Sequence, residues 1–214
     1  MARTRANCGV VLKASLTSIE VPKVIRNLTV SVFWVLSSTT AVAQAPMPQL
    51  SSASLGDAKF GMTAGEVERA LGRKIVLKGD ARKAGIAKFR CGDAGIEGIP
   101  GVDLHFEYGR MVAATLSGPP LSTRSGFTVG DPESNVISKF KSDSTYDRSP
   151  NQHADPNDKD RLMEITLGSR RFNPRTNQYE GNAVKFTSQR GVVKFIEAGQ
   201  SSYVLLVEHD GGCD

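Results

Sequence analysis

The sequence has few of the residues that catalytic and metal sites use. It contains three histidines and three cysteines among 214 residues. It also lacks a C-x-x-C pair, a G-x-S-x-G nucleophile turn and a glycine-rich phosphate loop. A catalytic site needs an activated nucleophile, a metal cluster or paired carboxylates in a pocket. The sequence therefore predicts a non-enzymatic protein with no cofactor, and it assigns no catalytic, cofactor-binding or metal-ligating residue.

The sequence also lacks an apolar run long enough to cross a bilayer, which takes about 20 residues. The apolar stretch 28–36 follows Lys23 and Arg26, and the polar residues 37–40 interrupt it. A small-x-small triplet then ends at Ala43, which is the layout of a secretory signal peptide. We therefore interpret 1–43 as an N-terminal extension with a cleaved signal, and a retained membrane anchor is the alternative.

Export has consequences for charge, location and partners. The chain carries 27 Lys and Arg against 22 Asp and Glu. Residues 1–43 hold five of those basic residues and one acidic residue, so the remainder is close to neutral. A near-neutral exported protein gives no support to a nucleic-acid partner. The prediction is a periplasmic or secreted protein with no stable membrane span, and no cysteine stands at the cleavage point to accept a lipid.

Cleavage would remove Cys8 and leave two cysteines, Cys91 and Cys213. Two cysteines in an oxidising compartment most simply pair. We predict a disulfide between them that fastens the C-terminus to the middle of the chain. A metal or redox pair is the rival interpretation.

The first structural signal is "GMTAGEVERALG". It follows a polar stretch over 44–57 that shows no periodicity and is expected to be a flexible lead-in. Thr63 and Glu66 have the spacing of a capping box, and Gly72 is a natural helix stop. These signals predict one short helix. Strand candidates follow at 74–78 and 87–91. Alternation over 102–108, a turn at Gly109 and a return through Val112, Ala114 and Leu116 then predict an antiparallel hairpin.

The same order recurs after a connector at 117–126. "GDPESNVISKF" begins sixty-nine residues after "GMTAGEVERAL", with Asp131 as the expected N-cap and Pro132 as the first helical residue. A polar loop over 142–160, a strand over 162–167, a hairpin over 184–196 and a last strand over 203–209 complete the pattern. The expectation is an α+β fold with two helix-plus-hairpin repeats, 58–118 and 119–214, that share one antiparallel sheet with the helices on one side.

"FGMTAGEVERALG" resembles the helix start of outer-membrane-assembly lipoproteins of the SmpA/BamE type and of the β-lactamase inhibitory protein. "STRSGFTVGDPESNV" and "EHDGGC" are similar to segments of uncharacterised bacterial envelope proteins with a duplicated layout. The resemblance covers about residues 58–213 and implies a tandem of helix-plus-hairpin units on a concave sheet. The residues that carry it are glycines and apolar positions, which specify a fold rather than an activity.

Three polar stretches are the remaining functional candidates. Asp103, His105 and Glu107 share one strand face, which is also the pattern of a solvated strand. The segment 155–160, "DPNDKD", mimics a calcium loop but places a lysine at the fifth position. The segment 169–175, "SRRFNPR", gathers arginines around a phenylalanine, as an anionic-ligand patch or a solvated turn does.

Two functions follow as hypotheses. The first is a module of the bacterial envelope that binds another envelope or secreted protein, or a cell-wall or glycan component, through the polar sheet face or the 142–160 loop. The second is a hydrolase of envelope material with an unrecognised site. A shallow polar face favours binding, whereas a deep pocket that unites His105 or His209 with buried carboxylates favours catalysis.

Overall fold

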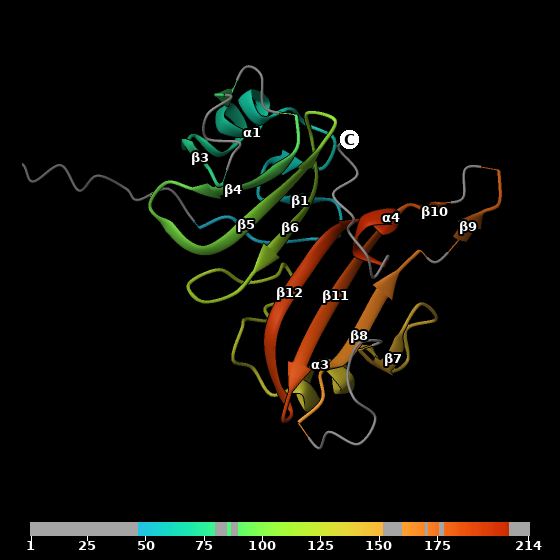
Figure 1. Cartoon of the computed structure of the whole chain (residues 1–214). Helices are drawn as coiled ribbons and strands as arrows, with labels where there is room; N and C mark the ends of the chain where they lie inside the picture. The colour runs from blue at the N-terminus through green and yellow to red at the C-terminus, as the bar shows by residue number, and fades with distance from the viewer. Residues whose placement is uncertain are drawn as a thin grey trace, which may run out of the picture. The chain divides into compact units, whose positions relative to one another are not determined.

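The computed structural model describes residues 47–79, 85–86, 90–151, 160–169, 171–175 and 178–205. The chain divides into the units Met1–Ala43 and Gln44–Asp214, and every described residue belongs to the second unit. That unit has an α+β fold that is mostly β: a large antiparallel sheet of eight strands with a few short helices (Figure 1).

The strands of the large sheet are β3 (Ile75–Leu77), β4 (Gly92–Ile96), β5 (Ile99–Glu107), β6 (Arg110–Leu116), β7 (Asp147–Pro150), β8 (Met163–Gly168), β11 (Asn182–Gln189) and β12 (Val192–Gln200). Two small pairs lie outside it: β1 (Ser54–Leu55) with β2 (Ala58–Lys59), and β9 (Arg171–Asn173) with β10 (Gln178–Glu180). The helices are α1 (Ala64–Leu71), α3 (Glu133–Phe140) and α4 (Ser201–Val204).

The strand order of the large sheet is β3-β4-β5-β6-β12-β11-β8-β7. Chain neighbours pair as hairpins within each half, and β6 pairs with β12 at the centre. That central seam aligns Ala113 with Gly199 and Leu116 with Ile196. The prediction of an α+β fold built on one large antiparallel sheet is therefore confirmed.

α1 begins and ends where its sequence signals predict. Thr63 and Glu66 form the capping box, in which the Thr63 amide and hydroxyl both donate to Glu66 Oε2 at 2.8 Å. Gly72 ends the helix with a φ of 62°, a left-handed conformation that glycine adopts without strain. The side chain of Val67, on the inner face of α1, is fully buried. An eight-residue helix is too short to persist alone, so its stability depends on this packing.

The capping box makes stability depend on acid pH. The hydrogen bonds from Thr63 hold the pKa of Glu66 below its usual range. A carboxyl whose pKa is lower in the folded state stabilises above its unfolded pKa of about 4.3 and loses that contribution as the pH falls. We expect Glu66→Gln to be less stable than wild type at pH 7, with the difference disappearing below about pH 4 in urea titrations. Glu97→Gln, in the exposed β4–β5 turn, is the control, and a difference independent of pH contradicts this account.

α3 begins one residue later than its signals predict. Pro132 is the N-cap instead of the first helical residue, and the helix starts at Glu133. Asp131 does not cap the helix, because its Oδ2 accepts a hydrogen bond from the Thr128 amide at 2.8 Å. The Glu133 side chain is buried and accepts from Arg148 Nε of β7 at 2.7 Å, so this helix is tied to the sheet edge.

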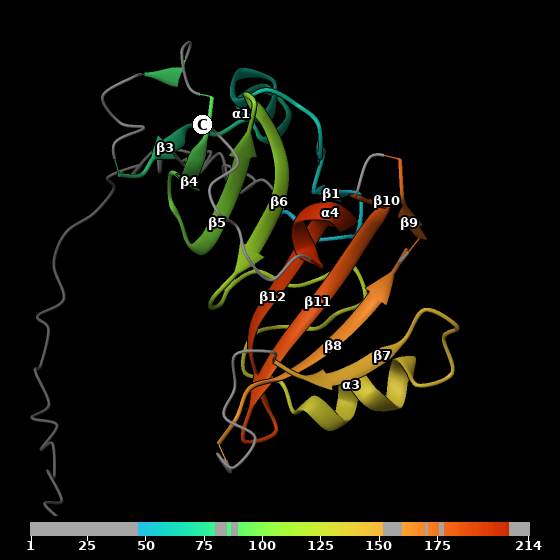
Figure 2. The same ribbon diagram turned by 45° about the vertical axis from the view of Figure 1, so that its right-hand side comes forward.

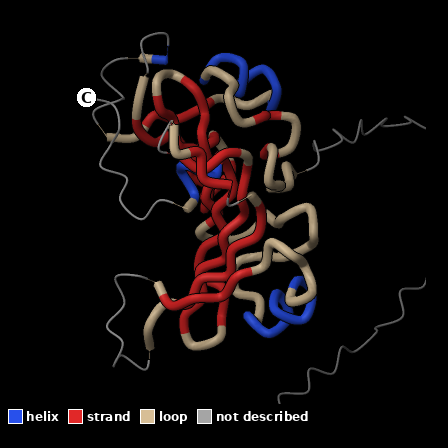
Figure 3. The backbone as a smooth tube through the Cα atoms, turned by 90° about the vertical axis from the view of Figure 1, so that its right-hand side faces the viewer, coloured by secondary structure: helices blue, strands red, loops and turns tan. Residues whose placement is uncertain are grey.

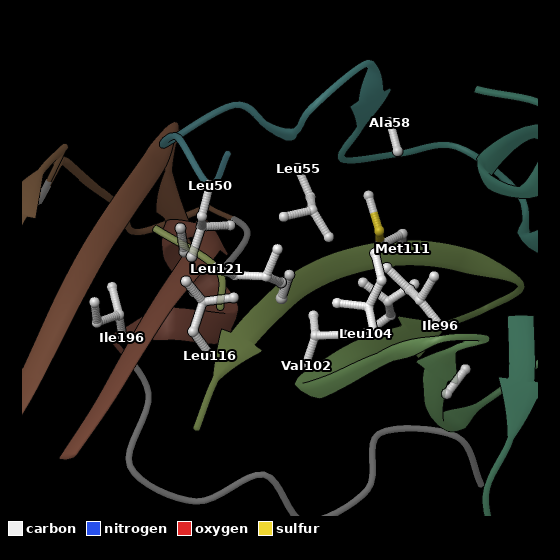
Figure 4. Close-up of a cluster of buried hydrophobic side chains, with 14 of the residues drawn as sticks. Leu50, Leu55, Ala58, Ile96, Val102, Leu104, Met111, Leu116, Leu121 and Ile196 are labelled. Atoms are coloured by element: carbon white, nitrogen blue, oxygen red, sulfur yellow. The ribbon is translucent and has the colours of Figure 1, made fainter. Parts of the chain in front are cut away.

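The hydrophobic core, part of which Figure 4 shows, lies on the face of the sheet that carries α1 and α3. One row of that face crosses four strands in register, from Leu104 through Ala114 and Ala198 to Val184. Figure 3 shows these two helices on the same side of the sheet. At the second half of the sheet, Phe186 contacts the rings of Phe127 and Phe140, with centroids 5.7 and 6.2 Å away.

Several sequence predictions were wrong in detail. The lead-in over 44–57 packs into the hydrophobic core from Leu50 onward, because the side chains of Leu50 and Leu55 are buried. The polar loop over 142–160 contains strand β7, and its residues 152–159 lie outside the described residues. Within the strand predicted over 87–91, Arg90 and Cys91 are not in a strand, and β4 begins at Gly92.

The prediction of a last strand over 203–209 was wrong for residues 203–205, the part that the structure describes. Residues 201–204 form the single turn of α4, and residues 206–209 lie outside the described part. The alternation of apolar residues there resembles a strand, but the turn packs across the sheet instead of adding to it. The chain therefore does not extend the sheet at Tyr203.

Candidate functional site

The face of the sheet opposite α1 and α3 carries the polar side chains, and we call it the polar face. Strand alternation and register assign its residues. Its central row pairs Asp103 with Thr115, Thr115 with Glu197, Glu197 with Lys185, and Lys185 with Thr166. The row thus crosses five adjacent strands, two from one half of the sheet and three from the other. This face is the candidate functional site.

His105 is the centre of a hydrogen-bonded chain on the polar face. Its Nδ1 lies 2.8 Å from Asp93 Oδ1, and its Nε2 lies 2.7 Å from Thr115 Oγ1. A carboxylate only accepts, so Nδ1 donates to Asp93, and in the neutral ring Nε2 accepts from the Thr115 hydroxyl. The sequence placed His105 with Asp103 and Glu107, which share its strand, but the bonded partners come from the strands on either side.

α4 lies over β11 and β12 on the polar face (Figure 2). The positions beneath it are small: Ala113, Gly199 and Ala183 align across three strands. Val204 packs on the two alanines, and Tyr203 stacks on His105 with ring centroids 5.3 Å apart. Small residues on the strands therefore allow a helical turn to approach closely.

Burial raises the pKa of the Tyr203 hydroxyl well above its usual range, and the carboxylates of Glu197, Asp93 and Glu107 raise it further. The hydroxyl therefore stays protonated near neutral pH and cannot act as a base there. Burial also raises the pKa of Glu107. The polar face thus brings carboxylates from three different strands close to one aromatic ring.

Lysine–carboxylate ion pairs lie on the polar face where it is described. Lys185 Nζ is 2.9 Å from Glu197 Oε2, and their side chains are only 18% and 12% exposed. Lys78, just beyond β3, pairs with Asp103. A pair as buried as Lys185–Glu197 fixes the geometry of the sheet centre, because removal of one partner leaves the other charge poorly solvated.

Three cavities formed by described residues lie away from His105 and have volumes of about 560, 440 and 440 Å³. Each is lined by residues of the helix-bearing side, such as Leu71, Thr63 and Phe140, and none is lined by His105. These cavities do not combine with the His105 cluster into one pocket.

The predicted disulfide, the other two histidines and the calcium-like segment lie only partly within the described residues. Cys91 is disulfide-bonded, and its predicted partner Cys213 lies outside the described residues. His153, His209 and residues 155–159 of the calcium-like segment also lie outside them. Asp160, the last residue of that segment, accepts from Arg190 Nε at 2.6 Å, which lowers its pKa.

Where it is described, the arginine-rich segment 169–175 is mostly exposed and belongs to a small hairpin. β9 pairs with β10, and Phe172 contacts Tyr179 edge to face with centroids 5.5 Å apart. Arg171 is 3.7 Å from Glu180 across the pair, while Arg170 lies outside the described residues. One of the arginines is therefore balanced by a carboxylate of its own hairpin.

Within the described ranges, no three His, Cys, Asp or Glu side chains are grouped in a way that could hold a metal ion. No helix in this part of the chain combines the length and apolar character that a bilayer crossing requires.

No protein-family model, curated protein sequence or solved structure matches this chain. The polar face is consequently interpreted from its own residues.

Proposed function

We propose that the protein is an exported, non-enzymatic binding module of a bacterial envelope, which holds another envelope or secreted protein on its polar face. The observation that carries the proposal is the central polar row, which runs in register from Asp103 to Thr166 across both halves of the sheet. Apolar strand residues pack on the other face, so this row is not needed to fill the core. A broad charged surface suits a protein partner better than a small substrate.

Export is part of this proposal. The signal features that end at Ala43 support it, and so does the disulfide-bonded state of Cys91. Disulfides persist in exported proteins because their compartment is oxidising. The pairing of Cys91 with Cys213 remains a prediction.

We further propose that the two halves are tandem repeats. The supporting observation is that both helix starts attach to their hairpins in the same way. The Gly61 amide donates to the Met111 carbonyl at 2.7 Å, and sixty-nine residues later the Gly130 amide donates to the Val193 carbonyl at 2.9 Å. The return bonds, from Met111 to the Met62 carbonyl and from Val193 to the Asp131 carbonyl, are equivalent as well.

The hairpins themselves support the same proposal. Their turns have the same conformation, with positive φ at Tyr108 and Gly109 and again at Arg190 and Gly191. Both hairpins also change register at the same distance from the turn. An offset of 82 residues relates the two turns, and it also relates Thr115 to Glu197, which face each other directly across the seam. The local two-fold axis would pass between those two residues.

The hydrolase remains the alternative, and the Asp93–His105–Thr115 chain is the observation that favours it. Carboxylate, imidazole and hydroxyl in this order form the arrangement that activates a nucleophile. Acyl transfer also needs free N–H groups aimed at the developing oxyanion. At Thr115, β6 is paired on both sides, so the backbone N–H groups belong to the sheet ladder. This geometry makes catalysis the less favoured function.

Site-specific photo-crosslinking tests the binding proposal. A photoreactive phenylalanine analogue would replace Val76 or Phe195, each 45% exposed on the polar face at opposite halves of the sheet. Lys139, exposed on α3, provides the control on the opposite side. In cells that export the full protein, we expect both polar-face positions to give the same discrete adduct and Lys139 to give none.

Two results would contradict the proposal. One is the absence of any adduct specific to the polar face. The other is hydrolysis of envelope material by the wild-type protein that His105→Gln abolishes, which would favour the alternative.

A further inference from the structure

Phe195 is an exposed aromatic residue in the interior of the sheet. It lies on β12, and 45% of its surface is accessible. Its register partner on β11 is Thr187, and the partner of Thr187 on β8 is Glu164. Figure 1 shows these three strands side by side. Phe195 and Glu164 therefore occupy one row of the polar face, with Thr187 between them.

The proposed repeats give this row a counterpart. Under the 82-residue offset, Phe195 and Thr187 correspond to Ala113 and His105. At that first position a small residue lies beneath α4, and the ring of Tyr203 stacks on His105. In the second half of the sheet, Phe195 occupies the position that corresponds to Ala113, and much of its ring is accessible. In the first half of the sheet, the chain's own Tyr203 ring covers His105. In the second half, the equivalent row carries the Phe195 ring, which is accessible to a partner.

The geometry of Phe195 and Glu164 suits one side chain that contacts both. Neighbouring strands are about 4.8 Å apart, so the two residues are separated by about 10 Å at the backbone. Asn151 Nδ2 donates to Glu164 Oε1 at 2.8 Å, which orients the carboxylate. An extended arginine can lie over an aromatic ring and present its guanidinium to a carboxylate at this distance.

The charge of the polar face favours a cationic occupant. Its strand residues include two cations, Arg110 and Lys185. They also include six carboxylates, those of Asp93, Asp103, Glu107, Asp147, Glu164 and Glu197. Lys185 pairs with Glu197, and the Arg110 guanidinium donates to the Gly61 carbonyl at 2.7 Å. Among the described residues of this face, the carboxylates outnumber the cations even with Lys78 and the exposed bulge residue Lys194 included, so the field of these residues favours basic partners.

We propose that Phe195 and Glu164 form the anchor point for an arginine on a basic segment of the partner protein. The inference rests on the proposed binding function and specifies the chemistry of the partner. Arginine fits better than lysine, because its planar guanidinium both stacks on a ring and bonds a carboxylate with two donors. A second copy of this chain fits poorly, because its own polar face is acidic.

Peptide titrations followed by amide NMR test the anchor point. The probes are acetylated, amidated hexaarginine, hexalysine and hexaglutamate, added to the full protein at low salt. We expect hexaarginine to shift the resonances of Phe195, Thr187 and Glu164, and to bind more tightly than hexalysine. Phe195→Ala should weaken hexaarginine binding about fivefold, the effect of losing one exposed cation–π contact. Glu164→Gln should weaken it similarly.

Phe172→Ala is the matched control, because Phe172 is equally exposed, at 47%, but lies on β9 outside the large sheet. It should leave the affinity unchanged, and the spectrum of each variant reports whether the fold is retained. Equal binding of hexaarginine to wild type and Phe195→Ala overturns the proposal, as does equal binding of hexaglutamate. A crosslinked partner without a basic contact surface overturns this inference while the binding function stands, whereas absence of any polar-face adduct overturns the binding function itself.

Discussion

Gly199→Ala is expected to lower the free energy of unfolding by about 3 kcal/mol, at the upper end of typical overpacking effects. Gly199 faces Ala113 across the β6–β12 seam. A Cβ atom there would lie 2.3 Å from the Val112 carbonyl oxygen and 2.6 Å from Ala113 Cα. The contacted atoms belong to backbone, so the strands must move apart. Alanine also reduces the entropy of the unfolded chain, but that gain is only about 0.4 to 1 kcal/mol.

Urea unfolding monitored by circular dichroism measures the change. Gly118→Ala is the control, since a Cβ at Gly118 meets no atom within 4 Å, and it should alter stability by less than about 0.5 kcal/mol. Equal losses in the two variants would show that the seam contact is not the cause. Because α4 follows directly on Gln200, the Gly199 variant should also weaken the stacking of Tyr203 on His105.

Lys185→Ala is expected to destabilise the protein by about 2 to 3 kcal/mol at pH 7. The substitution leaves the Glu197 carboxylate, 12% exposed, without its ammonium partner. Loss of one member of a fully buried pair has a larger effect, about 3 to 5 kcal/mol, and partial solvation reduces it here. Thermal and urea unfolding both report the change.

The double variant Lys185→Met with Glu197→Leu separates charge from packing. It removes both charges and retains apolar volume, so we expect its stability to lie within about 1 kcal/mol of wild type. If the double variant loses as much as Lys185→Ala, the effect arises from packing and the account of an unpaired charge is wrong. The result also bears on function, because this pair occupies the centre of the proposed binding face.

The sequence identified elements whose signals are local. The capping box of Thr63 and Glu66, the stop at Gly72 and the turn at Gly109 each involve residues a few positions apart. Period-two alternation likewise specified the two long hairpins, because each strand buries one face. These features need no knowledge of distant contacts, and the structure has them at the expected positions within about a residue.

The missed elements depend on distant partners. β4 contains two glycines and little alternation, and it is a strand because β3 and β5 pair on either side. β7, with the sequence DRSP, is recruited to the sheet edge by β8 and by the Arg148–Glu133 bond. α4 has strand-like composition, and it becomes a helical turn because small residues beneath it leave room on the polar face.

The candidate site could be predicted only in part. That Asp103, His105 and Glu107 share a face follows from alternation alone. The bonds from His105 to Asp93 and Thr115 depend on cross-strand register, which alternation does not specify. The exposed position of Phe195 was likewise hidden, because an aromatic residue in a hairpin ordinarily packs into the core, and a register shift between Thr187 and Ser188 turns it to the polar face.

Local sequence signals alone located the starts of α1 and α3 to within a residue, the turns of the two long hairpins, and the shared face of Asp103, His105 and Glu107. Those properties follow from backbone conformation and from contacts over a few residues. The pairing of β6 with β12, the position of α4 on the polar face, and the row that Phe195 shares with Glu164 could be found only from the folded chain. Each of these depends on the order and register of strands far apart in the chain, because hydrogen bonds between strands are made by backbone groups that every residue carries.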